Sequence, residues 1–95
     1  MPIVILYLTT GDVVIAEYLN EEGSSYTQVM RPLRMIISDK GIMLQMWFPY
    51  DMDKPVKINN DLVVACSEAA PPLAAEYKSK FSDLIVPDKP GLIVP

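Results

Sequence analysis

The sequence predicts a mainly β protein in which antiparallel strands are followed by one C-terminal helix. Up to residue 66, runs of β-branched and apolar residues alternate with short turns that carry Gly, Asp or Asn. From residue 71 the pattern changes, because a Pro-Pro pair precedes apolar residues at helical spacing. The chain has 95 residues, and we therefore expect a single domain.

The first half of the chain predicts a hairpin and a long, interrupted strand. Residues 3–9 and 13–19 are apolar runs joined by a turn with Gly and Asp, a pattern typical of a β-hairpin. The next run, Tyr26–Ser38, contains Pro32. Proline lacks the backbone donor that a sheet ladder requires, so Pro32 indicates an edge, a bulge or a bend between two half-strands.

Two later segments are apolar on both faces. Residues 41–50 hardly alternate between apolar and polar residues, and residues 62–66 form a second such run after a short entry segment at 56–58. A strand that buries one face alternates strictly. We therefore predict five strands in meander order, two of which are covered by something outside the monomer.

The C-terminal part predicts a helix from about 72 to 85. Its apolar face carries Leu73, Tyr77, Phe81 and Leu84, which we expect to pack across one open end of the strand assembly. Prolines in residues 87–95 predict an irregular tail.

Composition narrows the classes of function. The net charge of −4 argues against broad, non-specific binding to phosphate, although a local basic patch stays open. Cys66 is the single cysteine, which predicts no internal disulfide and fits a reducing compartment. No apolar run approaches the length of a membrane span. We expect a cytoplasmic protein without a membrane partner.

Residue types that support catalysis are sparse. The chain has no histidine, which removes the commonest acid–base group and metal ligand, and Cys66 is interpreted as a core thiol. Asp51, Asp53 and Asp61 could hold a hard divalent cation, but a solvated turn needs no such fixed geometry. We predict no enzymatic activity, no cofactor and no metal site.

Two motifs resemble those of the Sm-like (LSm) family of small barrels. Residues 6–19 read LYLTTGDVVIAEYL, with Ala16 where the family has a small residue, and residues 58–65 read INNDLVVA, with Asn59-Asn60 in place of Arg-Gly. The chain as a whole resembles Sm-like proteins of marine-phage (cyanophage) type over residues 3–66. The resemblance implies a five-stranded, strongly bent antiparallel barrel of SH3-like shape. Its helix stands last here, whereas the family's helix usually precedes the first strand.

The resemblance also implies a homo-oligomeric ring. Sm-like proteins pair the fourth strand of one subunit with the fifth strand of the next, and a protein of phage origin would do so in the host-cell cytoplasm. The residues that we expect at this interface are Met43, Leu44, Met46, Trp47, Phe48, Leu62, Val63 and Val64.

Sm-like proteins bind single-stranded RNA near the centre of the ring. The corresponding candidates for contacts with single-stranded RNA, or DNA, are Lys54, Lys57, Asn59, Asn60, Tyr50, Arg31 and Arg34. Tyr50 or Tyr26 could supply a face for base stacking. The alternative is that these residues are solubilising charges and core aromatics, and that the chain is an oligomeric interaction or assembly module without nucleic acid.

Overall fold

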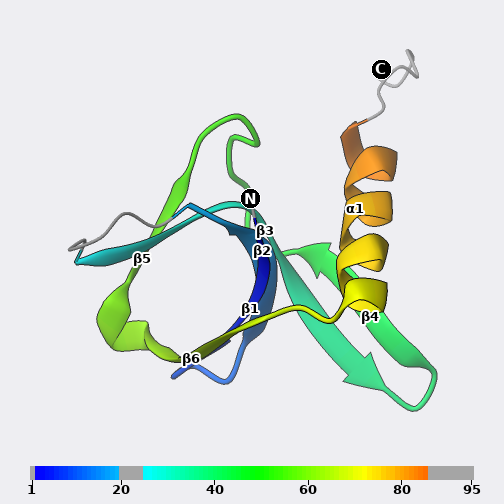
Figure 1. The fold of residues 1–95 in the computed structure, drawn as a ribbon, viewed down its shortest axis with the longest axis horizontal. Coiled ribbons are helices and arrows are strands. Elements are labelled where there is room, and N and C mark those ends of the chain that lie inside the picture. The colour runs from blue at the N-terminus through cyan, green and yellow to red at the C-terminus, as the bar shows by residue number, and fades with distance from the viewer. Residues whose placement is uncertain (1, 20–24, 86–95) are drawn as a thin grey trace.

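Six strands form one antiparallel sheet, and a single helix follows them (Figure 1). This computed structural model describes residues 2–19 and 25–85, with the backbone alone for 81–85. The elements are β1 (Ile3–Leu8), β2 (Val13–Tyr18), β3 (Tyr26–Ser38), β4 (Gly41–Met46), β5 (Val56–Asn59), the 3₁₀ turn η1 (Asn60–Leu62), β6 (Val63–Glu68) and α1 (Pro71–Ile85). The predicted fold class is confirmed.

The strand order is β4-β3-β2-β1-β6, with β5 paired to β3. The segment at 56–58, which was predicted as a short entry to the last strand, is a separate strand, β5 (Val56–Asn59). The sheet therefore has six strands rather than the five predicted. The predicted tail at 87–95 lies outside the described residues, as do the side chains of Phe81 and Leu84.

A bulge in β3 bends the sheet. The first half of β3 pairs with β5 and the second half pairs with β4, while β2 runs beside both halves. Its register against β2 shifts between Ile15 and Glu17, so Arg31 and Pro32 together oppose a single residue of β2. Arg31 has φ 51, in the left-handed region. Of the edge, bulge or bend that Pro32 indicated, the structure has a bulge, and the two half-strands on either side of it pair with different partners.

The bent sheet encloses one core and carries a second on its outer face. The inner core gathers Val4, Leu6, Leu8, Val14, Ala16, Val29 and Ile58. The outer core gathers Ile5, Ile15, Leu33, Met35, Leu44 and Tyr77. In Figure 1, β1, β2, β3, β5 and β6 curl into a barrel, and α1 stands outside this barrel, beside β3 and β4.

The position of α1 corrects one expectation. The helix does not plug an open end of the barrel; Leu73 and Tyr77 pack against the outer core instead. Tyr77 is 1% exposed, and among the described residues it has the largest of the fully buried side chains. The physical reason is that the alternate residues of β1, β2 and β3 that point out of the barrel are also apolar, and they need a cover.

Candidate functional site

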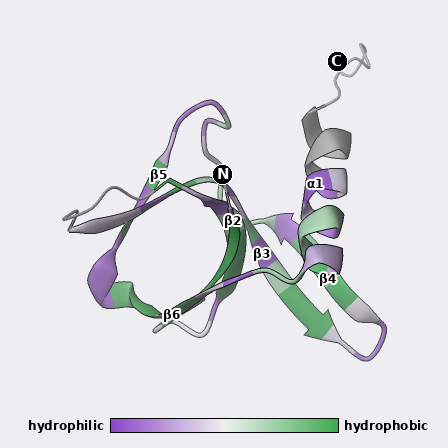
Figure 2. Ribbon diagram, viewed as in Figure 1, coloured by the Kyte–Doolittle hydropathy of each residue, from purple (hydrophilic) through white to green (hydrophobic). Residues whose placement is uncertain are grey.

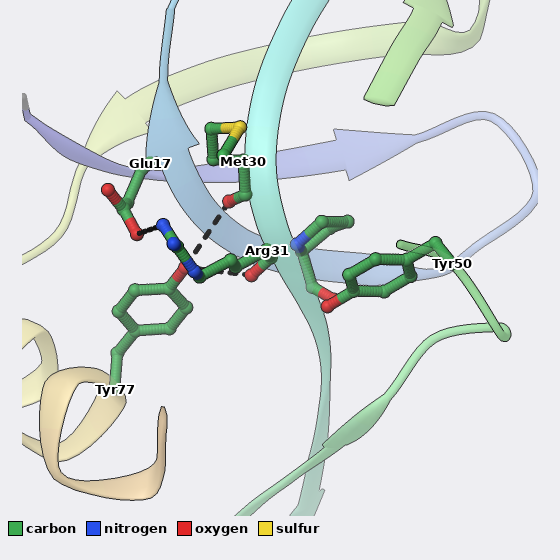
Figure 3. Close-up of polar contacts among 6 residues, drawn as sticks. Glu17, Met30, Arg31, Tyr50 and Tyr77 are labelled. Atoms are coloured by element: carbon green, nitrogen blue, oxygen red, sulfur yellow. Dashed lines mark hydrogen bonds and ion pairs between the residues drawn. The ribbon is translucent and has the colours of Figure 1, made fainter. Parts of the chain in front are cut away.

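Two tyrosine hydroxyls hold the bulge of β3 (Figure 3). The Tyr77 hydroxyl donates to the carbonyl oxygen of Arg31 at 2.7 Å and lies 3.3 Å from that of Met30. The Tyr50 hydroxyl, from the segment after β4, donates to the carbonyl oxygen of Pro32 at 2.7 Å. The two tyrosines thus supply hydrogen-bond donors to three successive carbonyls at the bulge. Tyr50 is thus a structural residue of the bulge.

Burial keeps both tyrosine hydroxyls protonated, so that each can donate a hydrogen bond. Burial raises the pKa of Tyr50 to about 12, against a smaller lowering by the Arg31 guanidinium. Burial also raises the pKa of Tyr77 far above its ordinary value, and the Glu17 carboxylate adds to this shift. A neutral phenol keeps the hydrogen that it donates.

The two arginines pair with two different carboxylates. Arg31 Nη1 lies 3.1 Å from Glu17 Oε2, with both side chains largely buried. Arg34 Nε lies 3.5 Å from Asp12 Oδ1, in a more exposed pair. The charge of each guanidinium is thus largely balanced inside the chain, which reduces what either offers to an external phosphate.

Two successive asparagines, Asn59 and Asn60, shape η1. The Asn59 side-chain oxygen accepts from the backbone N–H of Asp61 at 2.8 Å, and so caps the 3₁₀ turn. The Asn60 side-chain oxygen accepts from the Thr27 hydroxyl at 2.7 Å and ties η1 to β3. Both asparagines therefore have a structural role at the turn that leads into β6.

The lysines lie differently. Lys54 is exposed at the end of a turn in which its backbone N–H donates to the carbonyl of Asp51. Lys57 is exposed on β5, and its Nζ lies 5.9 Å from the ring centroid of Tyr26 on β3. Of the seven residues predicted to contact nucleic acid, these two are exposed cations that form no ion pair within the described part of the chain, whereas the exposed Arg34 pairs with Asp12.

The outward face of the β3–β5 pair brings polar and aromatic side chains together. Tyr26 is opposite Asn59, and Gln28 is opposite Lys57, so all four share a face, while Thr27 is buried on the other. Gln28 was not among the predicted residues. The alternation of apolar and polar residues at 56–59 is a signal for this face, but the pairing of β3 with β5 is needed to join its two halves.

The sheet has three edge strands in the described part of the chain. β4 and β5 pair only with β3, along its two halves, and β6 pairs only with β1. Figure 2 shows apolar residues along the second half of β3 and along β4. The exposed large apolar residues on β4, on β6 and next to them are Ile42, Met43, Met46, Phe48, Leu62 and Val64, of which Val64 is 67% exposed.

The predicted interface set divides into three groups. Met43, Met46, Phe48, Leu62 and Val64 are exposed. Trp47 and Val63 are half-buried and pack against the inner core, and Leu44 is a member of the outer core. The apolar character of residues 41–50 therefore reflects both an exposed surface and the monomer's own packing.

Cys66 corrects another expectation. It is exposed on β6 rather than part of a core. Partial burial raises its pKa, which disfavours the thiolate. Among the described residues, no group of three or more His, Cys, Asp or Glu side chains is placed to hold a metal ion.

No protein-family model matches the chain, and no curated protein matches it. No helix within residues 2–19 and 25–85 is long and apolar enough to cross a membrane.

Proposed function

We propose that this chain is a non-enzymatic, Sm-like protein that assembles with copies of itself into a closed ring. The observation that carries the proposal is the pair of open, apolar edges, β4 and β6, at opposite ends of one strand order. An exposed edge strand readily pairs with another chain, and a closed assembly leaves no edge exposed.

The two edges are different strands, so the contact is head to tail. A head-to-tail contact gives a ring when its repeated rotation closes, and an open filament when it does not. The small size of the domain favours such an assembly, because about 95 residues bury only a modest core of their own.

Light scattering on the eluting protein tests the ring at tens of micromolar. We expect one closed oligomer for the wild type, and a monomer for Val64→Lys, since a lysine on an edge strand opposes pairing. Tyr7→Lys is the matched control, because Tyr7 is exposed on β1, a strand with a partner on each side. A wild-type protein that elutes as a monomer would overturn the proposal.

A second role that we propose is the binding of single-stranded nucleic acid, RNA favoured over DNA, in RNA or DNA processing. The observation that supports it is the Lys57 ammonium near the exposed ring of Tyr26. An aromatic face beside a cation suits a stacked base and its phosphate, and stacking contributes about 1–3 kcal/mol per base. A ring repeats this pair in every subunit, which concentrates positive charge locally on an acidic protein.

Fluorescence anisotropy with labelled oligo-U and oligo-A across a salt series tests this second role. We expect log affinity to fall linearly with log salt for the wild type, and binding to be lost in Lys54→Glu/Lys57→Glu. The control is Lys78→Glu on α1, which replaces one exposed lysine by glutamate and so makes the same change of charge per site. If the wild-type ring shows no binding, the function that remains is that of an assembly module which engages proteins.

A further inference from the structure

The apolar row of the outer core continues past the residues that α1 covers. On one side of the β3–β4 hairpin, the cross-strand pair Met35 and Leu44 is buried in a cluster with Tyr77 of α1. Side chains alternate between the two sides of a strand, so the next pair on this side is Ile37 and Ile42. These two residues are 69% and 47% exposed. The helix therefore leaves an apolar surface open at the turn end of the hairpin.

Two adjoining hollows lie beside this surface, between β4 and α1. The wider hollow has a volume of about 490 Å³ and is lined by Gly41, Ile42, Pro72, Leu73 and Glu76. The second hollow, of about 270 Å³, shares three of these residues and extends to the lysines Lys40 and Lys80. Ligand sites in proteins are concave and mostly apolar, with a few polar groups and a volume of about 300–1,000 Å³. The two hollows together have this form, an apolar part with a cationic end.

The cationic end has one positive charge in excess. Lys40 lies in the β3–β4 turn, where its backbone N–H donates to the Ser38 hydroxyl at 3.3 Å, and Lys80 is partly buried on α1. Among the described residues, neither ammonium group has an ion-pair partner. Glu76 has the only carboxylate among the residues that line the two hollows. This excess stands out on a chain whose net charge is −4, and it suits a ligand with a single negative charge.

We propose that these hollows bind a free fatty acid, with the hydrocarbon chain in the wider hollow and the carboxylate between Lys40 and Lys80. The chain covers Ile42 and Leu73, which removes apolar surface from water. A carboxylate carries one negative charge and balances the excess, whereas a phosphate monoester carries about −1.5 to −2. The inference goes beyond the proposed ring and nucleic-acid binding and depends on neither.

The shape of the site favours a single free chain over a membrane surface. The hollows are bounded by β4 on one side and by α1 on the other. One hydrocarbon chain can lie between a strand and a helix, but a bilayer cannot enter there without separating them. A lipid that remains in its bilayer is therefore not the proposed ligand.

Calorimetric titration of the wild-type protein tests the chemistry of the ligand. Dodecanoate, kept below the concentration at which it forms micelles, should bind once per chain. Dodecylammonium, with the same hydrocarbon and the opposite charge, should bind at least about tenfold more weakly. Octanoate should also bind at least about tenfold more weakly, because it buries fewer CH₂ groups. Equal affinity for dodecanoate and dodecylammonium would overturn the cationic head site.

Amide NMR shifts on the same protein test the place of binding. Dodecanoate should produce its largest shifts at the amides of Gly41, Ile42, Leu73 and Glu76, which line the hollows. The control region is the exposed apolar edge around Val64, which should respond least. Largest shifts at Val64 would show adventitious binding to an apolar edge and overturn the proposed site.

Substitutions of the charged lining residues give effects of opposite sign. Lys40→Gln/Lys80→Gln should weaken dodecanoate binding at least about tenfold, and Glu76→Gln should strengthen it at least about twofold by removing a repulsive charge. Lys78→Gln, an exposed position on α1 that lines neither hollow, is the control and should leave the affinity unchanged. Circular dichroism verifies that each variant is folded. Unchanged affinity in the folded double lysine variant would overturn the proposed contact.

Two other occupants of the hollows are distinguished by the same measurements. Sedimentation of the protein with phosphatidylglycerol vesicles, without binding of dodecanoate, would show a membrane surface and overturn the proposal. Shifts at Gly41 and Leu73 that appear on raising the protein concentration alone, again without dodecanoate binding, would show that a second copy covers the hollows. Light scattering tests the ring separately, because no residue of β6 is among those that line the hollows.

Discussion

The Tyr77 hydroxyl lies 2.7 Å from the carbonyl oxygen of Arg31, a residue 46 positions earlier in the chain. This hydrogen bond joins the helix to the one place where β3 departs from its ladder. The same side chain fills the outer core. The bulge and the docking of α1 are therefore one structural unit, and a change at either should be felt at the other.

Tyr77→Phe removes the hydroxyl and keeps the ring. We expect a loss of about 1–3 kcal/mol in the free energy of unfolding, because the carbonyls of Met30 and Arg31 lose their donor in a partly buried place. Urea denaturation measures this loss. Tyr7→Phe, at an exposed position on β1, is the control and should change stability by less than about 0.5 kcal/mol. Equal effects of the two substitutions would mean that the hydroxyl of Tyr77 has no special role.

Arg31→Gly and Arg31→Ala should differ in stability. Both lose the ion pair with Glu17, so their difference isolates the backbone, which has φ 51 at this position. Glycine adopts the left-handed region freely and alanine does not, so Arg31→Gly should be about 1 kcal/mol more stable than Arg31→Ala.

The matched pair is Arg34→Gly and Arg34→Ala, in the regular part of β3. There the order should reverse, because glycine in a strand interior costs about 0.5–1 kcal/mol relative to alanine. Urea midpoints measured side by side give both differences. The same sign at both positions would contradict the strain at Arg31.

Stability should fall at alkaline pH. Burial raises the pKa of Tyr50 to about 12, whereas an unfolded tyrosine titrates near 10. The unfolded chain therefore releases its proton first as the pH rises. The stabilisation from the neutral phenol is complete below about pH 10 and is lost between about 10 and 12. Tyr77, whose pKa is raised further, adds to the slope.

Melting temperatures recorded from pH 8 upward check this dependence. They should decline above about pH 10 in the wild type, and less steeply in Tyr50→Phe/Tyr77→Phe. An equally steep decline in the double variant would assign the alkaline loss to other groups.

Local patterns were enough to predict five of the six strands, the turns after β1 and β3, and the helix. Glycine at φ 94 in the β1–β2 turn and at φ 119 after β3 supplied turn signals, and Pro32 indicated an interruption of β3, as an edge, a bulge or a bend. The position of α1 could not be read in the same way. The outward side chains of Ile15 and Leu33 look like any core residues in the sequence, and only the sheet topology shows that they form a second core on the outer face.

The candidate site was predictable in type but not in detail. Exposed cations could be named from the sequence, but their partners are distant in it: Glu17 for Arg31, and Asp12 for Arg34. Tyr50 and the two asparagines were equally ambiguous, because a residue type suited to nucleic acid is also suited to a bulge or a cap. Cross-strand register decides between these roles, and register depends on the bulge rather than on composition.

Leu44→Ala and Met43→Ala should separate the monomer's core from its proposed interface. Leu44 is 4% exposed in the outer core, so Leu44→Ala should cost about 2–4 kcal/mol in the free energy of unfolding. Met43 is 53% exposed on the neighbouring position of β4, so Met43→Ala should change the unfolding of the isolated chain by less than about 0.5 kcal/mol. Denaturation at a protein concentration low enough to give monomers measures both.

Light scattering at tens of micromolar should then show weaker assembly in Met43→Ala, whose apolar side chain lies at the open edge. Unchanged assembly in Met43→Ala, together with a large loss of monomer stability, would place Met43 in the core and remove it from the interface.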